Sequence, residues 1–211
     1  MSAIVTASNG WVYKPITEVD AANLMMCFKD YPLSQGNTPI TYEERLTFFS
    51  ETLLRNESGT LPLSEDAVPG IVRVYGLFKP DGTLVGARSY KFFTPGEVNV
   101  LHYVVHPDHR NQGYTKVFRA LEHKGLWNHY NITTIKAVLE STPTFAAMNA
   151  LKSTWNAGGA NLEGGDSTSL DWNLDKDGNQ VALKLMVGTR AQAEALVAAD
   201  NDWKDITYTF S

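Results

Sequence analysis

A chain of 211 residues is long enough for one ordinary domain with a substantial core. Hydrophobic residues make up 43% of it and charged residues 19%, which excludes an intrinsically disordered or fibrous protein. The net charge of −5 gives no overall basic field, so it disfavours nucleic acid or an anionic membrane as partner. No apolar run approaches the roughly 18 residues of a membrane span, and the amino terminus lacks a signal-peptide pattern. We therefore expect a cytoplasmic protein.

The first third of the chain predicts one short strand followed by two helices. Residues 11–14 alternate between apolar and polar, as in a strand, and a Thr17/Asp20 pair then suits the start of a helix over about 18–29. Thr41 and Glu44 form a capping box before a second helix, expected over about 42–55. Residues 56–70 contain two Gly and two Pro without periodicity, so we expect a long loop there.

The middle of the chain predicts a meander of strands and then a helical crossover. Turn residues separate three β-branched and aromatic runs, at 71–79, 83–93 and 97–105. A helix over 115–128 and a strand over 133–139 follow. Because a helix joins the strands 97–105 and 133–139, we expect these two to run parallel.

The last third predicts a helix, two strands and a tail. The elements expected are a helix at 143–156, strands at about 167–174 and 179–187, a helix from Thr189 to about 199, and a strand at 206–210. The order of elements predicts an α/β fold: a mixed, mostly antiparallel central sheet flanked by helices, with one parallel strand pair. We expect one domain over residues 1–188, with 189–211 as a helix–strand extension packed on it.

The segment 104–116 has the features of an anion-binding turn. It follows the carboxyl end of a parallel strand, where ligands of such sheets bind. Pro107 ends the strand, and Gly113 allows a close approach of backbone to ligand before a helix whose first amides are unpaired. Lys116 and Arg119 lie three apart on that helix and could face the same anion. A diphosphate or a CoA would suit this site.

The pattern V-x-H-P-x-x-R-x-x-G-x in this segment resembles the acyl-CoA-binding motif of the GNAT N-acyltransferase superfamily, Arg/Gln-x-x-Gly-x-Gly/Ala. Arg110, Gln112 and Gly113 fit the pattern, and Thr115 departs from its final small position. The order of elements over residues 11–187 is similar as well. The resemblance implies that loop amides hold the pyrophosphate of acetyl-CoA and that the preceding strand end binds the pantetheine. The residues implied in acyl-CoA binding are Tyr103, Val104, Val105, Arg110, Asn111, Gln112, Gly113, Tyr114, Thr115, Lys116, Arg119 and Asn149.

The resemblance also implies transfer of the acyl group to a primary amine by direct attack. The family's catalytic base falls on Asn99, which cannot take a proton, whereas Glu97 is expected on the same strand face and could act directly or through water. Strict alternation would put Tyr103 on this face too. Glu140, at the end of the neighbouring strand, is a competing candidate. The family's usual tyrosine acid falls near Trp155, which is no acid at neutral pH.

Other functions stay open beside this interpretation. A non-catalytic acyl-CoA-binding or regulatory module would accommodate Asn99 and Trp155, and a nucleic-acid-modifying relative is disfavoured by the acidic charge. We expect no metal site, because the spacing of His102, His106 and His109 would need a helix that Pro107 opposes. The lone Cys27 lies among apolar residues and is expected to be a buried hydrophobe. The amine acceptor is not readable from the sequence, and a homodimer stays open.

Overall fold

The structure is a computed structural model that describes residues 4–27, 34–35, 38–39, 72–94, 96–140, 162–163, 172–174 and 180–211. The helices expected over 42–55 and 143–156, and the loop expected over 56–70, lie outside these residues. Within the described ranges, no helix has the length and apolar character that a membrane crossing needs.

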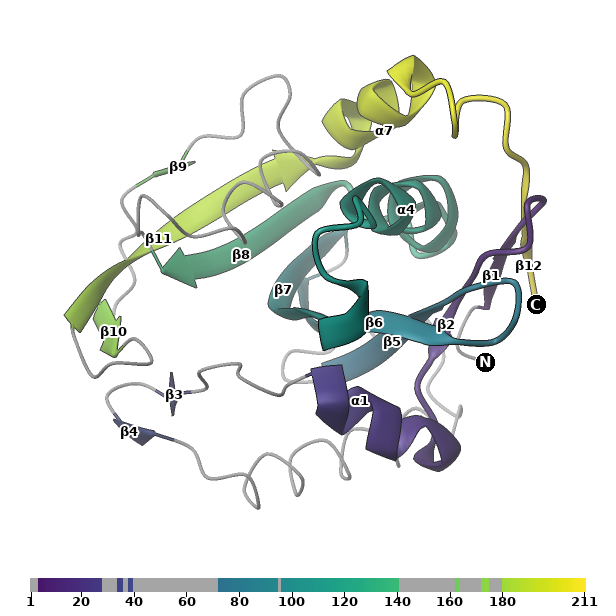
Figure 1. The fold of residues 1–211 in the computed structure, drawn as a ribbon. Helices are drawn as coiled ribbons and strands as arrows, with labels where there is room; N and C mark the ends of the chain where they lie inside the picture. Colours follow the sequence, from purple (N-terminus) through teal and green to yellow (C-terminus); the bar gives the residue numbers. More distant parts are fainter. Residues whose placement is uncertain are drawn as a thin grey trace.

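The described strands form a ten-stranded mixed sheet with one parallel pair (Figure 1). Along the sheet the order is β10 (Trp172–Leu174), β11 (Gln180–Thr189), β8 (Thr134–Glu140), β7 (Glu97–Val105), β6 (Leu84–Thr94), β5 (Val72–Phe78), β2 (Val12–Pro15), β1 (Val5–Ala7) and β12 (Tyr208–Phe210), with β9 (Leu162–Glu163) beside β11. The parallel pair is β7 with β8, as expected from the helix that joins them. A small separate hairpin joins β3 (Ser34–Gln35) and β4 (Thr38–Pro39).

The two ends of the chain extend the sheet at one edge, where the strand expected at 206–210 is β12. Strand β1 was not predicted from the sequence; it pairs antiparallel with both β2 and the C-terminal strand β12. Its side chains Val5 and Ala7 are buried, and this burial stabilises a strand of only three residues. Ile4 and Ser211 exchange backbone hydrogen bonds at 2.9 and 3.1 Å, so the first and last described residues lie side by side at this edge.

Local capping fixes the starts of two helices where the sequence predicts them. Backbone and hydroxyl groups of Thr17 both donate to the Asp20 carboxylate, at 3.1 and 3.0 Å, before the segment η1 (Glu18–Asp20) and α1 (Ala21–Cys27). Thr189 and Gln192 form a reciprocal capping box at the start of α7 (Arg190–Ala199).

One long helical segment covers one face of the sheet. It consists of α4 (Thr115–Ala120), the π-helical turn η3 (Leu121–Leu126) and α5 (Trp127–His129). The larger hydrophobic core lies between this segment, α7 and the sheet, and it includes Trp203 from the C-terminal tail. The smaller core lies on the other face, where α1 packs (Figure 1).

A charged pair is buried in the larger core. The guanidinium of Arg88 on β6 donates to the Glu122 carboxylate on η3, and both side chains are fully buried. The hydroxyls of Tyr90 and Tyr13 also donate to Glu122, so the carboxylate has three donors. Burial raises the pKa of Glu122, and Arg88 together with the tyrosine hydroxyls opposes that rise.

His123, the residue after Glu122, is expected to make the protein less stable in acid. Burial, with a smaller contribution from Arg88 and Arg119, holds the pKa of His123 well below its ordinary 6.5. Below about pH 6.5 the unfolded chain therefore binds a proton that the folded chain excludes, and the free energy of unfolding falls by up to about 1.4 kcal/mol per pH unit. Urea denaturation of wild type and His123→Phe between pH 7.5 and 5 measures this difference.

The control for this experiment is His129→Gln, because His129 is exposed on the same helical segment. The free energy of unfolding of His129→Gln should fall in acid as much as that of wild type. The fall should be smaller in His123→Phe. Equal slopes for wild type and His123→Phe would show that His123 does not stay neutral in the folded protein.

Candidate functional site

A β-bulge in β7 decides which side chains share a face of the sheet. Ser89 of β6 pairs with His102, but the next residue, Tyr90, pairs with Val100, so Leu101 is the extra residue in β7. Before the bulge, Val98 and Val100 point into the larger core. After it, Tyr103 and Val105 pack against that same core.

The bulge overturns one expectation from strict alternation. Glu97 and Asn99 alternate with Val98 and Val100, so they lie on the face away from the larger core. Tyr103 lies on the opposite face. Its ring packs edge-on against the ring of Phe118 in α4, with 5.1 Å between the ring centres. The expectation that Tyr103 shares a face with Glu97 and Asn99 is therefore wrong, because the inserted Leu101 shifts the pattern by one residue.

The parallel ladder between β7 and β8 is short. It runs from Glu97 opposite Thr134 to Val100 opposite Ala137. Within the described backbone, β7 continues to Val105 and β8 to Glu140, but the two strands no longer pair with each other there. The bulge and the end of the ladder coincide, so backbone groups beyond Val100 are available to an extended ligand at the carboxyl ends of the two strands.

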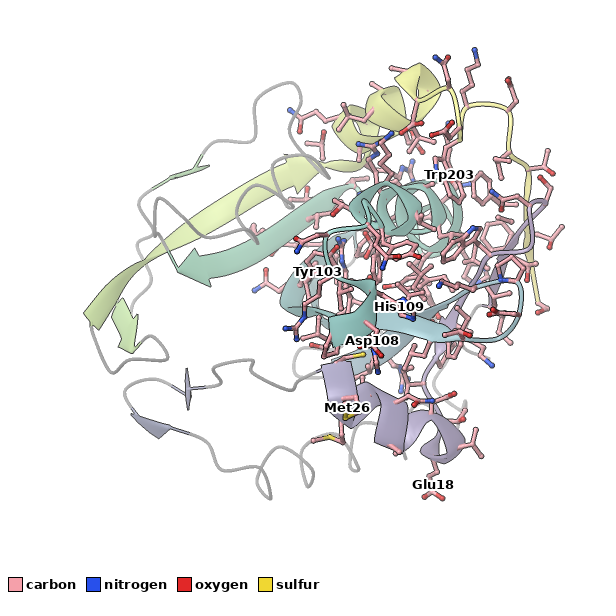
Figure 2. The ribbon with its side chains drawn as sticks, viewed as in Figure 1. Glu18, Met26, Tyr103, Asp108, His109 and Trp203 are labelled. Atoms are coloured by element: carbon pink, nitrogen blue, oxygen red, sulfur yellow. The ribbon has the colours of Figure 1, made fainter. Side chains whose placement is uncertain are left out.

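A turn with two positive φ angles connects β7 to the start of α4. Pro107 begins a 3₁₀ turn, η2 (Pro107–His109), and Figure 2 labels Asp108 and His109 there. Asn111 and Gly113 then adopt positive φ angles of 60° and 76°. A Cβ on Gly113 would meet no atom within 4 Å, and none of the described side chains caps the first turn of α4. There is therefore room for an anion in front of these helix amides.

Side chains of the motif hold the turn together. Arg110 Nε donates to the Val105 carbonyl at 3.2 Å, and Gln112 Nε2 donates to the Asp108 carbonyl at 2.9 Å. The Tyr114 hydroxyl donates to Gln112 Oε1 at 3.0 Å. The fit of Arg110 and Gln112 to the motif thus has a structural reason, since both side chains close the loop.

Thr115, where the motif has a smaller residue, contacts the end of β7. Its hydroxyl lies 3.2 Å from the Tyr103 hydroxyl, and the two share a hydrogen bond. The guanidinium of Arg88 also contacts Tyr103, at 4.2 Å from the centre of its ring. The departure at Thr115 therefore ties the start of α4 to the strand.

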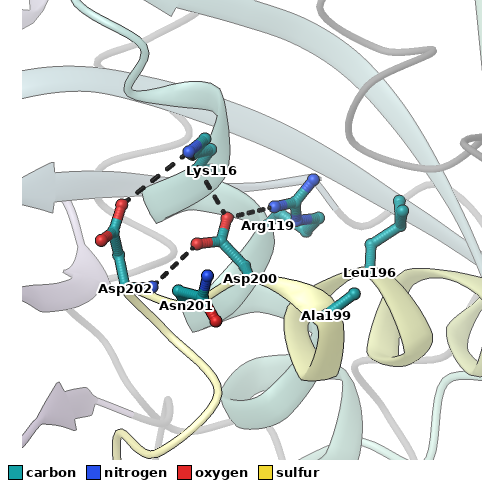
Figure 3. A pocket seen from close by; sticks show the side chains of 7 residues that line it. All are labelled: Lys116, Arg119, Leu196, Ala199, Asp200, Asn201 and Asp202. Atoms are coloured by element: carbon teal, nitrogen blue, oxygen red, sulfur yellow. Dashed lines mark hydrogen bonds and ion pairs between the residues drawn. The ribbon is translucent and has the colours of Figure 1, made fainter.

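The two cations expected to face an anion, Lys116 and Arg119, line a pocket of about 480 Å³ together with the end of α7 (Figure 3). Both contact carboxylates there. Arg119 Nη2 lies 2.8 Å from Asp200 Oδ2, and Lys116 Nζ lies 3.8 Å from carboxylate oxygens of Asp200 and Asp202. No local pattern predicts these partners, because 81 residues separate Arg119 from Asp200.

The candidate base, Glu97, lies on the face of the sheet away from the larger core. Glu97 Oε2 forms an ion pair with Lys136 Nζ of β8 at 2.9 Å. Asn99, directly opposite Lys136 in the ladder, has a buried Oδ1 without a hydrogen-bond partner among the described residues. Lys136 was missed from the sequence, although its place in the expected parallel strand beside Asn99 would have been the signal.

The remaining sequence candidates lie apart from this site or outside the described residues. Cys27 is 1% exposed, and burial raises the pKa of its thiol to about 12, which fits the expected buried hydrophobe. Asn149 and Trp155 lie outside the described residues. Glu140 is described only as the last residue of β8.

No protein-family model matches the sequence, and no curated protein does. The spermidine N-acetyltransferase from Vibrio cholerae, solved in complex with CoA and spermine, matches with a TM-score of 0.57 at 11% identity, over 87% of this chain and 98% of that chain. A protein assigned as a phosphinothricin N-acetyltransferase matches with a TM-score of 0.52 at 13% identity, over 85% of this chain and 98% of that one.

This chain has the fold of the GNAT N-acetyltransferases. The resemblance inferred from residues 104–115 is thereby confirmed at the level of the fold. So is the predicted mixed sheet with one parallel pair. At these identities the comparisons show the shared architecture alone.

Proposed function

We propose that this GNAT-fold protein is an acyl-CoA-dependent N-acyltransferase that moves an acetyl group from acetyl-CoA to a primary amine. The observation that carries the proposal is the end of the β7–β8 ladder at Val100 and Ala137, beside a glycine turn that enters a long helix. An opening between parallel strands suits an extended pantetheine, and a helix start suits a pyrophosphate. The structural relative solved with CoA and spermine supports this choice of ligand.

In the proposed complex, backbone amides within the 110–116 segment bind the pyrophosphate. The amides of Arg110 and Lys116 already donate to the Pro107 and Gly113 carbonyls, so those between them do the binding. The backbone from Tyr103 to Val105 binds the pantetheine, and Arg110 and Gln112 keep the turn closed. Lys116 and Arg119 already pair with carboxylates, so the proposed pyrophosphate site relies on the loop amides. Asn149 remains a proposed pantetheine contact from the family resemblance.

The proposed reaction is a direct attack within a ternary complex. The neutral amine nitrogen bonds to the thioester carbon, the C–S bond breaks, and the CoA thiolate leaves with the electron pair. The amine loses a proton to a base, and the thiolate takes one up from water. An intermediate on Cys27 is disfavoured, because its buried thiol is protonated at neutral pH.

Glu97 is the proposed base, with Asn99 beside it on the same face. The ion pair with Lys136 orients the Glu97 carboxylate, and an incoming ammonium would compete with Lys136 for the same oxygens. Asn99 Oδ1, which lacks a donor among the described residues, could accept a hydrogen bond from the acceptor amine.

Replacement of Glu97 should separate binding from chemistry. Glu97→Gln is expected to lower kcat about 100-fold while the affinity for acetyl-CoA stays nearly unchanged, because the amide keeps the shape but cannot accept a proton. Steady-state kinetics and calorimetry with acetyl-CoA measure the two quantities. Glu140→Gln is the matched comparison: if this variant loses kcat and Glu97→Gln does not, Glu140 is the base.

A second candidate function is a non-catalytic acyl-CoA-binding module. It is favoured by Asn99, which stands at the family's base position and cannot take a proton. Release of free CoA from acetyl-CoA with a panel of primary amines, polyamines among them, tests this alternative. Binding of acetyl-CoA without amine-dependent release for any acceptor would favour the module over the enzyme.

A further inference from the structure

The pocket between α4 and the end of α7 places two cations against two carboxylates (Figure 3). Lys116 and Arg119 come from the first turns of α4, directly after the proposed pyrophosphate loop. Asp200 is the C-cap residue that follows α7, and Asp202 lies further along in the C-terminal tail. We call Asp200 and Asp202 the acidic cap.

The contact between Arg119 and Asp200 is well protected from water. Their side chains are only 9% and 7% exposed, and Arg119 Nη2 lies 2.8 Å from Asp200 Oδ2. The backbone amide of Asp202 donates to the other carboxylate oxygen of Asp200 at 3.1 Å. Both oxygens of Asp200 are therefore engaged, and water screens this pair far less than an exposed one.

Asp202 completes the cap at the surface. Its side chain is 76% exposed, and its carboxylate lies 3.8 Å from Lys116 Nζ, as does the Asp200 carboxylate. The two positive charges of the helix thus face two negative charges. The helix start by itself would attract a phosphate, but the cluster as a whole has no net charge.

The 3′-phosphate is the charged group of CoA outside the pyrophosphate. We expect it to reach this pocket, because Lys116 lines the pocket and directly follows the proposed pyrophosphate loop. A phosphate monoester carries about −1.5 to −2 charges at pH 7. On approaching Lys116 it would meet the carboxylate of Asp202, and Arg119 is already occupied by Asp200. Attraction to the cations and repulsion from the cap then offset each other.

We propose that the acidic cap makes this protein indifferent to the 3′-phosphate, so that thioesters of 3′-dephospho-CoA bind as well as those of CoA. The inference rests on the proposed function, since it concerns the same acyl-CoA site. It names Asp202 as a residue that determines the choice of cosubstrate, with Asp200 as the residue that engages Arg119.

Calorimetric titration with CoA and with 3′-dephospho-CoA tests the proposal. Wild type should bind the two ligands with dissociation constants within about twofold. Asp202→Asn should bind CoA about three- to tenfold more tightly than 3′-dephospho-CoA, because one repelling charge a few ångströms from the phosphate is removed. Lys116→Met added to Asp202→Asn should abolish this gain.

Asp205→Asn is the control, because Asp205 is an exposed carboxylate of the same tail and its removal changes the net charge equally. It should leave the ratio of the two affinities unchanged. A wild type that prefers CoA by tenfold or more, or an Asp202→Asn variant with an unchanged ratio, overturns the acidic cap while the proposed acyl-CoA site stands. If wild type binds neither ligand, both the proposed function and the role of the acidic cap are wrong.

Discussion

Gly113→Val is expected to weaken acetyl-CoA binding about 100-fold, as measured by calorimetry. Gly113 has a φ of 76°, and no atom lies within 4 Å of the position that a Cβ would take. The valine would therefore not clash with the protein, but it would occupy the space in front of the α4 amides and shift the turn. Loss of two charge-assisted hydrogen bonds to a phosphate accounts for roughly 3 kcal/mol, which is about two orders of magnitude in affinity.

The control for this variant is Gly82→Val in the β5–β6 turn. Gly82 has a φ of 86°, and a Cβ there would likewise meet no atom within 4 Å, so the backbone strain is similar, about 1–2 kcal/mol of stability. Gly82→Val should keep acetyl-CoA affinity. Arg110→Ala should lose less than Gly113→Val, because Arg110 only closes the loop. If both glycine variants bind like wild type, the anion site at Gly113 is wrong.

Glu122→Leu is expected to destabilise the protein by about 3–5 kcal/mol, the largest stability change we predict. The substitution leaves the guanidinium of Arg88 fully buried without its carboxylate. It also removes the oxygen to which the Tyr90 and Tyr13 hydroxyls donate. Urea denaturation followed by far-UV circular dichroism measures the free energy of unfolding.

The double variant Arg88→Met with Glu122→Leu tests whether the loss of stability comes from breaking the buried ion pair. Replacing a buried ion pair by apolar residues of similar volume is often neutral, so the double variant should recover most of the loss. The coupling energy from the double-mutant cycle should then be several kcal/mol. A double variant whose loss of stability equals the sum of the two single losses would mean that Arg88 and Glu122 do not stabilise each other.

The strands, the capped helices and the motif loop could be predicted because each follows from neighbouring residues. β-Branched runs separated by turn residues define β5, β6 and β7 within one or two residues of the expected bounds. The Thr189/Gln192 capping box sets the start of α7 by contacts within one turn. The helix between two strands required the parallel pair β7 and β8, since a right-handed crossover is almost the only connection available.

The sequence by itself determined the order of elements and the motif at Arg110 to Thr115 on which the proposed acyl-CoA site rests, because these depend on local spacing. Only the tertiary structure decided the bulge at Leu101 that moves Tyr103 to the other face of the sheet. It also decided the partners of the charged groups: Lys136 for Glu97, and Asp200 for Arg119. Such pairs join residues distant along the chain, and their contacts depend on the register and packing of whole elements, which no local pattern specifies.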